Sequence, residues 1–370
     1  MDTQGLDLCR LFYDEVVRPV IDGSFPKLSY AAAVIGSGSE VLGFDDETSR
    51  DHDWGPHVML FVSENDCAAI GQAMQEALNQ AVPLTFRGHR IDFRPDGPIP
   101  HGGRYHCHCT EILTLPDFIL SYLNFDINDQ IESLDWLTFS EQKLRGITAG
   151  AVYHDEIGLQ ALRDRLAYYP RDVWLYMLTA GWSRIAQEEH LMGRAGSAGD
   201  EIGSAIMASR LVRDLMRLCF LMEKQYAPYP KWFGTAFGKL KCGRELTPIL
   251  RDIHLAKTWE DREKHFAAAW ERVGAVHNTL GITQPLQMTV SAFHTRPYMV
   301  CNAGEFGEAI RAQIKDPALS RLASRGLFGG IDQMSDSTAI LDNAYWRHAL
   351  RKLYDLGSME HPPDCGRIDT

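Results

Sequence analysis

Three carboxylates form the strongest candidate for chemistry in this sequence. Asp51 and Asp53 alternate around a histidine, and residues two apart in an extended segment project from the same side. Carboxylates on one side repel each other unless solvent or a divalent cation neutralises them, and Mg²⁺ favours a few carboxylates together with phosphate oxygens. Asp92, between two apolar residues of a strand-like segment, would complete this ligand set from an adjacent strand. Alternation also allows a simpler interpretation, with Asp92 on the solvated face of an edge strand.

A glycine-serine run, Gly36 to Ser39, supplies the elements of a phosphate site. Glycine lets backbone N–H groups approach an anion, the hydroxyls of Ser37 and Ser39 add donors, and a following helical turn points its positive end at phosphate. Thirteen residues, 38 to 50, separate Ser37 from the first carboxylate. Arg50 would reach a phosphate or offset the carboxylates; a local salt bridge to the acidic residues 45–47 is the alternative.

The elements around these residues alternate between helical and extended patterns. Apolar spacing predicts an opening helix, a short apolar segment ending at a turn, a β-rich segment, an amphipathic helix and a second strand-like segment. In order, these are residues 6–20, 30–36, 54–62, 67–81 and 84–95.

From about residue 115, long amphipathic stretches replace the short β-rich ones. The predicted helices are 116–123, 140–147, 157–168, 171–192, 200–226, 231–241, 244–255, 258–280, 304–314 and 341–355. We therefore expect an α+β chain, with a small mixed-sheet domain over residues 1–140 and a larger helical domain over 141–370. The glycine-rich stretch 192–204 marks either a plain interhelical loop or a functional break, with Asp200 capping the next helix.

Composition excludes several classes of function. With 37 basic and 49 acidic residues, the net charge of −12 disfavours a nucleic-acid substrate. The first twenty residues lack an uninterrupted apolar core, so we expect no signal peptide, no membrane span and a cytoplasmic protein. Eight scattered cysteines favour reduced thiols. The cluster from His106 to Cys109 has no second ligand pair at zinc spacing, so an incidental or structural role is expected, with a structural metal protein as the alternative.

Gly36-Ser37, the Asp51-His52-Asp53 pair and Asp92 resemble the signature of the DNA polymerase β-like nucleotidyltransferase superfamily. The segments "GSGSEVLGFDDETSRDHDWGP" and "RLVRDLMRLCFLMEKQYAPYPKWFG" are similar to a bacterial branch whose function is unknown. The sequence departs from the superfamily pattern in placing a polar histidine, His52, where an apolar residue is usual.

The resemblance implies nucleotidyl transfer with two Mg²⁺ ions, held by Asp51, Asp53 and Asp92, and with ATP or another nucleoside triphosphate as co-substrate. The expected reaction transfers AMP to a hydroxyl of a small molecule. A protein hydroxyl is the alternative acceptor, and a catalytically silent nucleotide-binding regulator is the alternative function.

The helical domain contributes further expected contacts. In related small-molecule enzymes a helical-domain glutamate acts as base, and the resemblance favours Glu189, seven residues after Trp182 and near the apolar face, whereas Glu188 is expected to be solvated. Arg194 would then approach the triphosphate. Lys231 and Lys239 lie among aromatic residues, which fits either nucleotide binding or a core helix whose lysines extend to solvent.

Overall fold

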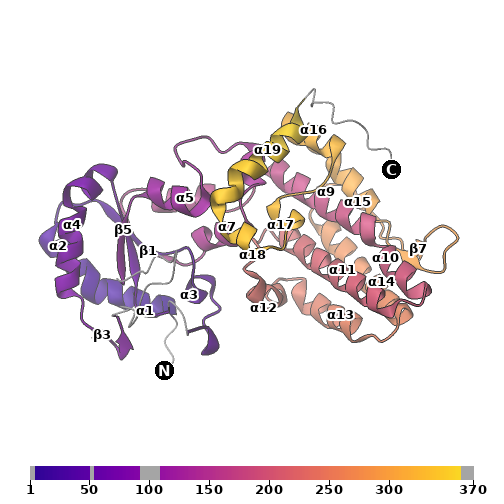
Figure 1. Ribbon diagram of the computed structural model, residues 1–370, viewed down its shortest axis with the longest axis horizontal. Helices are drawn as coiled ribbons and strands as arrows, with labels where there is room; N and C mark the ends of the chain where they lie inside the picture. Colours follow the sequence, from indigo (N-terminus) through magenta and orange to yellow (C-terminus); the bar gives the residue numbers. More distant parts are fainter. Residues whose placement is uncertain (1–4, 51–53, 92–108, 360–370) are drawn as a thin grey trace. The chain divides into compact units, whose positions relative to one another are not determined.

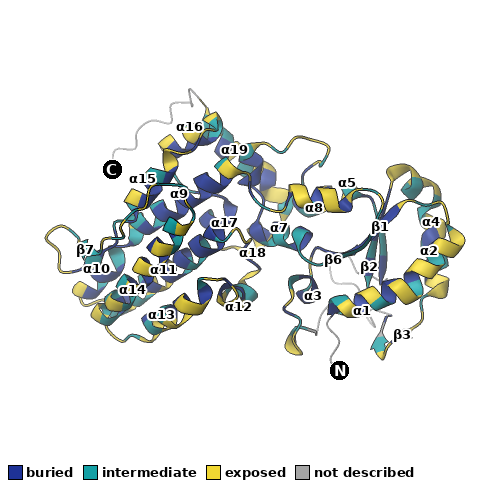
Figure 2. Cartoon of the chain, turned by 180° about the vertical axis from the view of Figure 1, so that it is seen from behind, coloured by how far each residue is buried: buried dark blue, intermediate teal, exposed yellow. Residues whose placement is uncertain are grey.

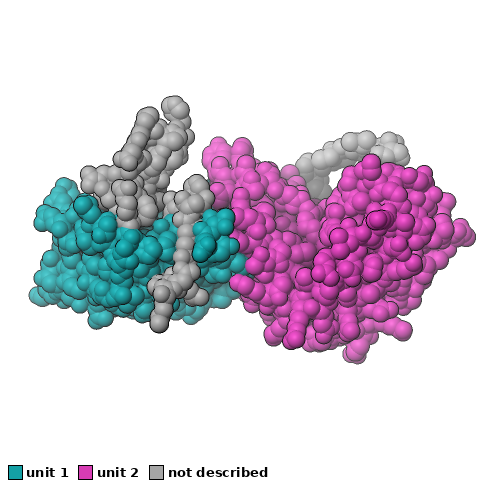
Figure 3. All heavy atoms as spheres, turned by 90° about the horizontal axis from the view of Figure 1, so that it is seen from below, with its two compact units in different colours: residues 1–130, 143–167 teal, residues 131–142, 168–370 magenta. Residues whose placement is uncertain are grey.

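The computed structural model describes residues 5–50, 54–91 and 109–359, and the chain divides into two compact units. Unit 1 comprises residues 1–130 and 143–167, and unit 2 comprises residues 131–142 and 168–370 (Figure 3). Unit 1 contains a small mixed sheet and unit 2 is larger and helical (Figure 1). The predicted α+β class is therefore confirmed.

Unit 1 is built on a four-stranded sheet with the order β5-β2-β1-β6. Its strands are β1 (Tyr30–Val34), β2 (Val58–Val62), β5 (Thr110–Leu113) and β6 (Ala151–Asp155). Central strand β1 is antiparallel to both neighbours, with Ala33 opposite Met59 of β2, and β5 runs parallel to β2 with Glu111 beside Met59. Because β1 and β2 are antiparallel, the last residue of β1 and the first residue of β2 lie at the same end of the two strands.

Helices cover this sheet and bury its apolar side chains. The other elements of unit 1 are α1 (Gly5–Phe12), the π-helical turn η1 (Tyr13–Val17), α2 (Arg18–Ser24), α3 (Ser39–Leu42), the 3₁₀ turn η2 (Thr48–Arg50), α4 (Glu64–Ala81), β3 (Thr85–Phe86), β4 (His89–Arg90), α5 (Leu115–Leu123), α7 (Glu141–Thr148), which straddles the boundary with unit 2, and α8 (Leu159–Arg165). Phe12 of α1, Leu78 of α4 and Leu60 of β2 share one core, whereas Phe61, next along β2, meets Phe118 of α5. The alternation of β2 thus serves helices on both faces.

The strand beside β2 differs from the expected one. Residues 85–90 form a separate two-stranded hairpin, β3–β4, instead of a strand of the main sheet. Strand β5 takes that place, and β6 adds the other edge; the pattern analysis predicted neither of them. Four or five residues are too few to show a clear period, and both strands pair with residues more than forty positions away.

Unit 2 surrounds a helix that is buried along most of its length. The elements are α6 (Ser133–Trp136), α9 (Arg171–Glu188), α10 (Leu191–Ser197), α11 (Glu201–Met222), η3 (Pro230–Trp232), α12 (Phe233–Gly238), α13 (Gly243–Leu255), α14 (Trp259–Thr279), β7 (Ser291–Ala292), β8 (Met299–Val300), α15 (Gly304–Arg311), α16 (Pro317–Arg325), α17 (Ile331–Met334), α18 (Thr338–Asp342), η4 (Ala344–Trp346) and α19 (Arg347–Ser358). Residues Val173 to Trp182 of α9 are buried without interruption (Figure 2). Such all-round burial requires neighbours on every side, and α11 and α15 supply much of it.

The division into units corrects the expected boundary at residue 140. Strand β6 pairs with β1, so unit 1 extends to residue 167. Residues 131–142 belong to unit 2, where the buried carboxylate of Asp135 pairs with Arg347 and, at 2.6 Å, with Arg351 of the C-terminal helix α19. Long-range pairing, which the local pattern does not show, sets the boundary.

Across the described ranges, no helix combines the length and apolarity needed to cross a bilayer.

Candidate functional site

The glycine-serine turn follows directly on central strand β1. Gly36 and Gly38 have φ angles of 96° and 141°, which residues with a side chain rarely adopt. The Gly36 N–H donates to the carbonyl of Gly146 on α7 at 2.9 Å, and a Cβ at Gly146 would lie 2.5 Å from the Gly36 oxygen. The turn is thus held from behind by a helix that approaches closely, while Ser37 is exposed.

Ser39 was predicted to contact phosphate, but in the structure its hydroxyl contacts the protein. Its side chain is buried, and its hydroxyl donates to the carbonyl of Ser49 at 3.0 Å. The hydroxyl proton is therefore used within the protein. The bond closes the loop that follows the turn, so the chain two residues before Asp51 lies against the start of α3.

The chain that follows Asp51 and Asp53 is also held near this loop. The Trp54 indole N–H and the Gly5 backbone N–H both donate to Oδ2 of Asp45, at 3.3 and 2.8 Å. Asp51, Asp53 and Asp92 themselves lie outside the described residues, as does the side chain of Arg50. The described chain on both sides of the Asp51–Asp53 segment thus contacts residues 39–45, directly after the turn.

A buried ionisable pair lies beside the turn. The Glu40 side chain is only 2% exposed, and its Oε1 lies 3.6 Å from Nε2 of His57. Nδ1 of His57 lies 2.9 Å from the carbonyl oxygen of Gly55 and 3.6 Å from Sγ of Cys9. Burial raises the pKa of Glu40, against the effect of His57. Burial opposes protonation of His57, but Cys9, Glu40 and the Gly55 carbonyl outweigh it and raise the pKa of His57 to about 9.

Two basic residues of α7 lie close to the turn and were missed by the sequence analysis. The Lys143 ammonium lies 4.2 Å from the centre of the Tyr122 ring, and this ring also borders Gly36. The Arg145 guanidinium lies 5.8 Å from the ring centre of Phe44. Both cations are half-buried. The basic pair just before Gly146 was visible in the sequence, but its proximity to Gly36 depends on a contact over a hundred residues along the chain.

Glu111 is a further acidic residue of the sheet. Glu111 is on β5 and pairs with Met59 of β2, the strand that follows Asp51 and Asp53 in the sequence. Thr110 and Ile112, its neighbours in the strand, alternate with it, and Ile112 packs in the core under α4. Alternation therefore directs Glu111 to the other face, where Gly36 meets Phe118 of α5.

No group of three or more potential metal ligands occurs among the described residues. His106, Cys107 and His108 lie outside them, so the expectation for this cluster is untested. Cys109 is buried in the core, and burial raises the pKa of its thiol to about 12, which makes it a poor thiolate ligand. The cysteines within the described ranges are free thiols.

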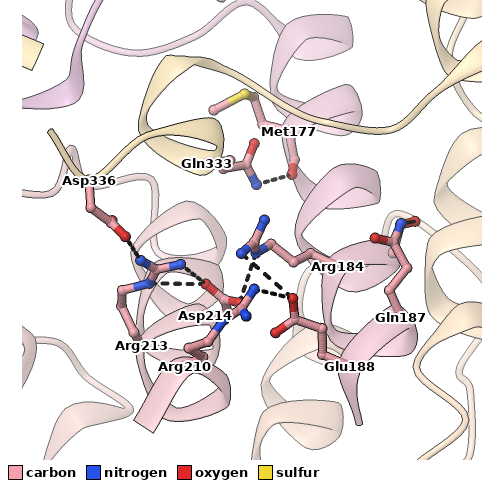
Figure 4. A network of polar contacts seen from close by, with 10 residues as sticks. Met177, Arg184, Gln187, Glu188, Arg210, Arg213, Asp214, Gln333 and Asp336 are labelled. Atoms are coloured by element: carbon pink, nitrogen blue, oxygen red, sulfur yellow. Dashed lines mark hydrogen bonds and ion pairs between the residues drawn. The ribbon is translucent and has the colours of Figure 1, made fainter. Parts of the chain in front are cut away.

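Unit 2 carries a polar network between α9 and α11 (Figure 4). Glu188, expected to be solvated, is 13% exposed at its side chain and pairs with Arg210 and, at 3.8 Å, with Arg184. Arg184 also donates from Nε to Asp214 at 3.0 Å, and Asp214 in turn accepts from Arg213. The expectation for Glu188 was wrong because Arg210 of another helix, 22 positions along the chain, pairs with it in addition to Arg184 of its own helix.

A cavity of about 420 Å³ borders this network. Arg184, Gln187 and Gln333 contribute to its polar wall, and Phe328 to its apolar wall. The Gln333 amide is occupied, since it donates to the carbonyl of Met177 at 3.0 Å and accepts from Gly330. Asp336 also accepts from Arg213, so the network balances three arginines against three carboxylates and offers no excess of either charge to a ligand.

The predicted helical-domain residues occupy separate places in unit 2. Glu189 is 7% exposed, and its Oε2 accepts from the backbone N–H of Cys301 at 2.7 Å, so the structure gives it a partner within the fold. Arg194 is exposed and lines a different cavity, on α10. Lys231 is exposed and lies 4.3 Å from the ring centre of Trp232, and Lys239 is exposed beyond α12. They are not brought together into one site.

Arg217 is a charged residue that the sequence analysis did not select. Its side chain is 14% exposed, 3.9 Å from Asp332 and packed over Phe233 of α12, with the ring centre 5.5 Å away. Its Nε and Nη1 atoms have no hydrogen-bond partner among the described residues. Positions 210, 213, 214 and 217 recur at helical spacing in "RLVRDLMR", a signal that could have identified this charged face.

Comparisons with known proteins found one family model and one solved structure. A family model described as a domain of unknown function (DUF4037) matches residues 136–233, less than half of the chain. Among solved structures, a nucleotidyltransferase-like protein from Exiguobacterium sibiricum 255-15 aligns with 78% of this chain and 82% of its own, at 10% identity and a TM-score of 0.30. No curated protein matches the chain.

Proposed function

We propose that the protein is a nucleotidyltransferase that moves a nucleoside monophosphate, with AMP from ATP as the leading case, onto a hydroxyl of a small molecule. The observation that supports it best is the closure of the loop after the glycine-serine turn. Ser39 holds Ser49, and Asp45 holds Trp54. The described chain on both sides of Asp51 and Asp53 is thereby held near the turn, as a site joining phosphates and metal-binding carboxylates requires.

The role proposed for each residue follows from the chemistry of the side chains and backbone groups near the end of β1. Backbone N–H groups that follow Gly36, whose own N–H donates to Gly146, would bind triphosphate oxygens, with Lys143 of α7 adding a positive charge. Asp51 and Asp53 would hold Mg²⁺, which when bound supplies neutralisation of the entering and leaving oxygens. The third carboxylate would be Asp92, with Glu111 on β5 as the alternative.

In the proposed reaction, the acceptor oxygen forms a bond to the α-phosphorus as the bond to the bridging oxygen of the β-phosphate breaks. Pyrophosphate leaves, and the acceptor proton passes to a carboxylate or to solvent. Asp92 or Glu189 is the proposed base. The buried Glu189 already accepts a hydrogen bond from the Cys301 N–H, which favours Asp92 as the base.

A labelling experiment tests this function without knowledge of the acceptor. The protein is incubated with Mg²⁺, a metabolite extract and ATP labelled at the α- or the γ-phosphate. Nucleotidyl transfer places α-label, and no γ-label, in an acid-stable product with release of pyrophosphate. Asp51→Asn and Asp53→Asn should nearly abolish both signals, whereas Asp14→Asn, at an exposed position of the same unit, should not.

The outcomes separate the alternatives. Label in the low-molecular-weight fraction supports a small-molecule acceptor, and label in precipitated protein supports a protein acceptor. Nucleotide binding without transfer would favour the silent regulator. Full activity in either aspartate variant would refute the carboxylate assignment.

Single substitutions distinguish the candidate ligands. Gly36→Val and Ser37→Ala should weaken nucleotide binding, the valine more severely, because a side chain at φ 96° strains the turn. Lys143→Met should weaken it as well. Comparing Asp92→Asn with Glu111→Gln identifies the third carboxylate as the one whose loss impairs transfer more than nucleotide affinity.

A further inference from the structure

A cavity of about 320 Å³ lies between α10 and the β7–β8 hairpin of unit 2. His190 and Arg194 line it from the α10 side, and Phe293, Arg296 and Tyr298 line it from the hairpin. The rings of His190 and Phe293 stack with centres 4.7 Å apart and planes 14° apart. Side chains from two separate elements therefore form one wall.

The hairpin is built firmly onto the helices. A Cβ at Gly193 of α10 would collide with the side chain of Tyr298, so only glycine allows this approach. The backbone N–H of Met299 donates to Oε2 of Glu263 at 2.6 Å, and that of Cys301 donates to Oε2 of Glu189 at 2.7 Å. Two carboxylates thus anchor the strand that carries one side of the cavity.

The charged side chains that line the cavity are basic. Both carboxylates are engaged by backbone donors, and the side chains that line the cavity include two arginines and a histidine but no acid. The guanidinium groups of Arg194 and Arg296 form no ion pair or hydrogen bond with any residue that the structure describes. In a chain with a net charge of −12, this is a local excess of positive charge facing a preformed hollow.

We propose that this cavity binds the phosphate group of a small phosphorylated molecule. Arg194 lines it from α10 and Arg296 from the β7–β8 hairpin, so two guanidinium groups can share the oxygens of one dianion. The apolar surface of Phe293 and Pro297 contacts the organic part. The volume fits a small ligand.

A doubly charged phosphate fits this lining better than a carboxylate does. One guanidinium suffices to neutralise a carboxylate and to match its two oxygens. Two guanidiniums and an imidazole at one hollow instead match a group with three accessible oxygens and a charge near −2. The residues that line the cavity all belong to unit 2, whereas the glycine-serine turn belongs to unit 1.

A ³¹P NMR titration of the full-length protein with inorganic phosphate tests the proposal. Excess EDTA removes divalent metal, so metal-dependent nucleotide binding does not contribute. Phosphate should bind saturably, and Arg194→Ala or Arg296→Ala should weaken binding about 10- to 100-fold, as expected for loss of one charged hydrogen-bonding partner. Arg194→Lys, which keeps the charge but loses the planar donor pair, should fall between these values.

Matched variants make the result decisive. Arg251→Ala removes another exposed arginine of the same unit, and this variant should bind phosphate as the wild type does. Acetate should compete poorly. The proposal is overturned by wild-type phosphate affinity in the Arg194→Ala/Arg296→Ala double variant, by equal competition from acetate, or by absence of saturable binding. Loss of phosphate binding in Ser37→Ala alone would assign the anion to unit 1 instead.

Discussion

His57 should remain protonated well above neutral pH, and removing the charge of Glu40 should lower the pKa of His57. Cys9, Glu40 and the Gly55 carbonyl surround the imidazole and, against the effect of burial, raise its pKa to about 9. A histidine signal in an NMR titration of labelled protein, assigned by its disappearance in His57→Gln, should therefore titrate near pH 9. In Glu40→Gln the same signal should titrate at a lower pH, because the carboxylate 3.6 Å from Nε2 has lost its charge.

The same shift predicts how stability depends on pH. A rise from 6.5 to about 9 corresponds to about 3 kcal/mol at 1.36 kcal/mol per pKa unit. Because the folded state binds the proton more tightly, this stabilisation is complete below the unfolded pKa and is lost as the pH rises through about 9. Solvent reaches 27% of the His57 side chain and screens part of the interaction, so about 2 kcal/mol is the expected contribution.

Urea unfolding at about pH 6 and about pH 9.5 measures this contribution. The wild type should lose about 2 kcal/mol more than His57→Gln does between the two pH values. Nucleotide affinity should fall over the same range, because loss of the imidazolium leaves the negative charge of Glu40 beside the turn at Gly38 uncompensated. Parallel stability curves for the two proteins, or a His57 signal that titrates near its ordinary value, would refute this account of the pair.

Three further substitutions test the packing that supports the candidate sites. Gly38→Ala should destabilise the protein by about 1–3 kcal/mol, since φ is 141° and the new methyl group would collide with the buried carboxylate of Glu40. The control Gly23→Ala, in open space on α2, should be neutral or slightly stabilising in thermal unfolding. Asp135→Ala should cost about 3–5 kcal/mol, because it leaves the buried guanidinium of its partner on α19 unpaired; an unchanged urea midpoint would contradict the assignment of residues 131–142 to unit 2. Glu189→Ala should cost about 1–3 kcal/mol by leaving the Cys301 N–H without its acceptor, and Glu189→Gln less, so a Gln variant with normal stability but lost turnover would restore the catalytic interpretation.

The long helices were predictable from the sequence because their apolar periodicity persists over several turns. The spacing of residues 200–226 and 258–280 predicted α11 (Glu201–Met222) and α14 (Trp259–Thr279) to within a few residues. The strands were less accessible. Residues 84–95 had strand-like composition, but residues 85–90 form the small hairpin β3–β4, since apolar content does not specify which strand a segment pairs with.

The candidate site shows the same limit at the level of single residues. Helical periodicity predicted that Glu189 lies near the apolar side of its helix, and Glu189 is buried. The same reasoning predicted that Glu188 is solvated, but Glu188 pairs with Arg210 of α11. Periodicity describes one helix, whereas the pair between Glu188 and Arg210 depends on two. Lys143 was overlooked for a similar reason, because its relation to the turn at Gly36 exists only once α7 packs against the end of β1.

The spacing of thirteen residues between Ser37 and Asp51 acquires a physical meaning in the structure. A loop of that length is long enough to form α3, to turn at Gly43 and to return, and the bond from Ser39 to the Ser49 carbonyl closes it. A polar side chain that satisfies a carbonyl ten residues away stabilises one loop geometry over the many that a flexible segment could adopt. The recurrence of glycine and serine in this run therefore has two separate causes. Gly36 and Gly38 allow the backbone to adopt the turn, and Ser39 holds the returning chain beside it, so the residue types that first indicated phosphate binding also include one that stabilises the loop.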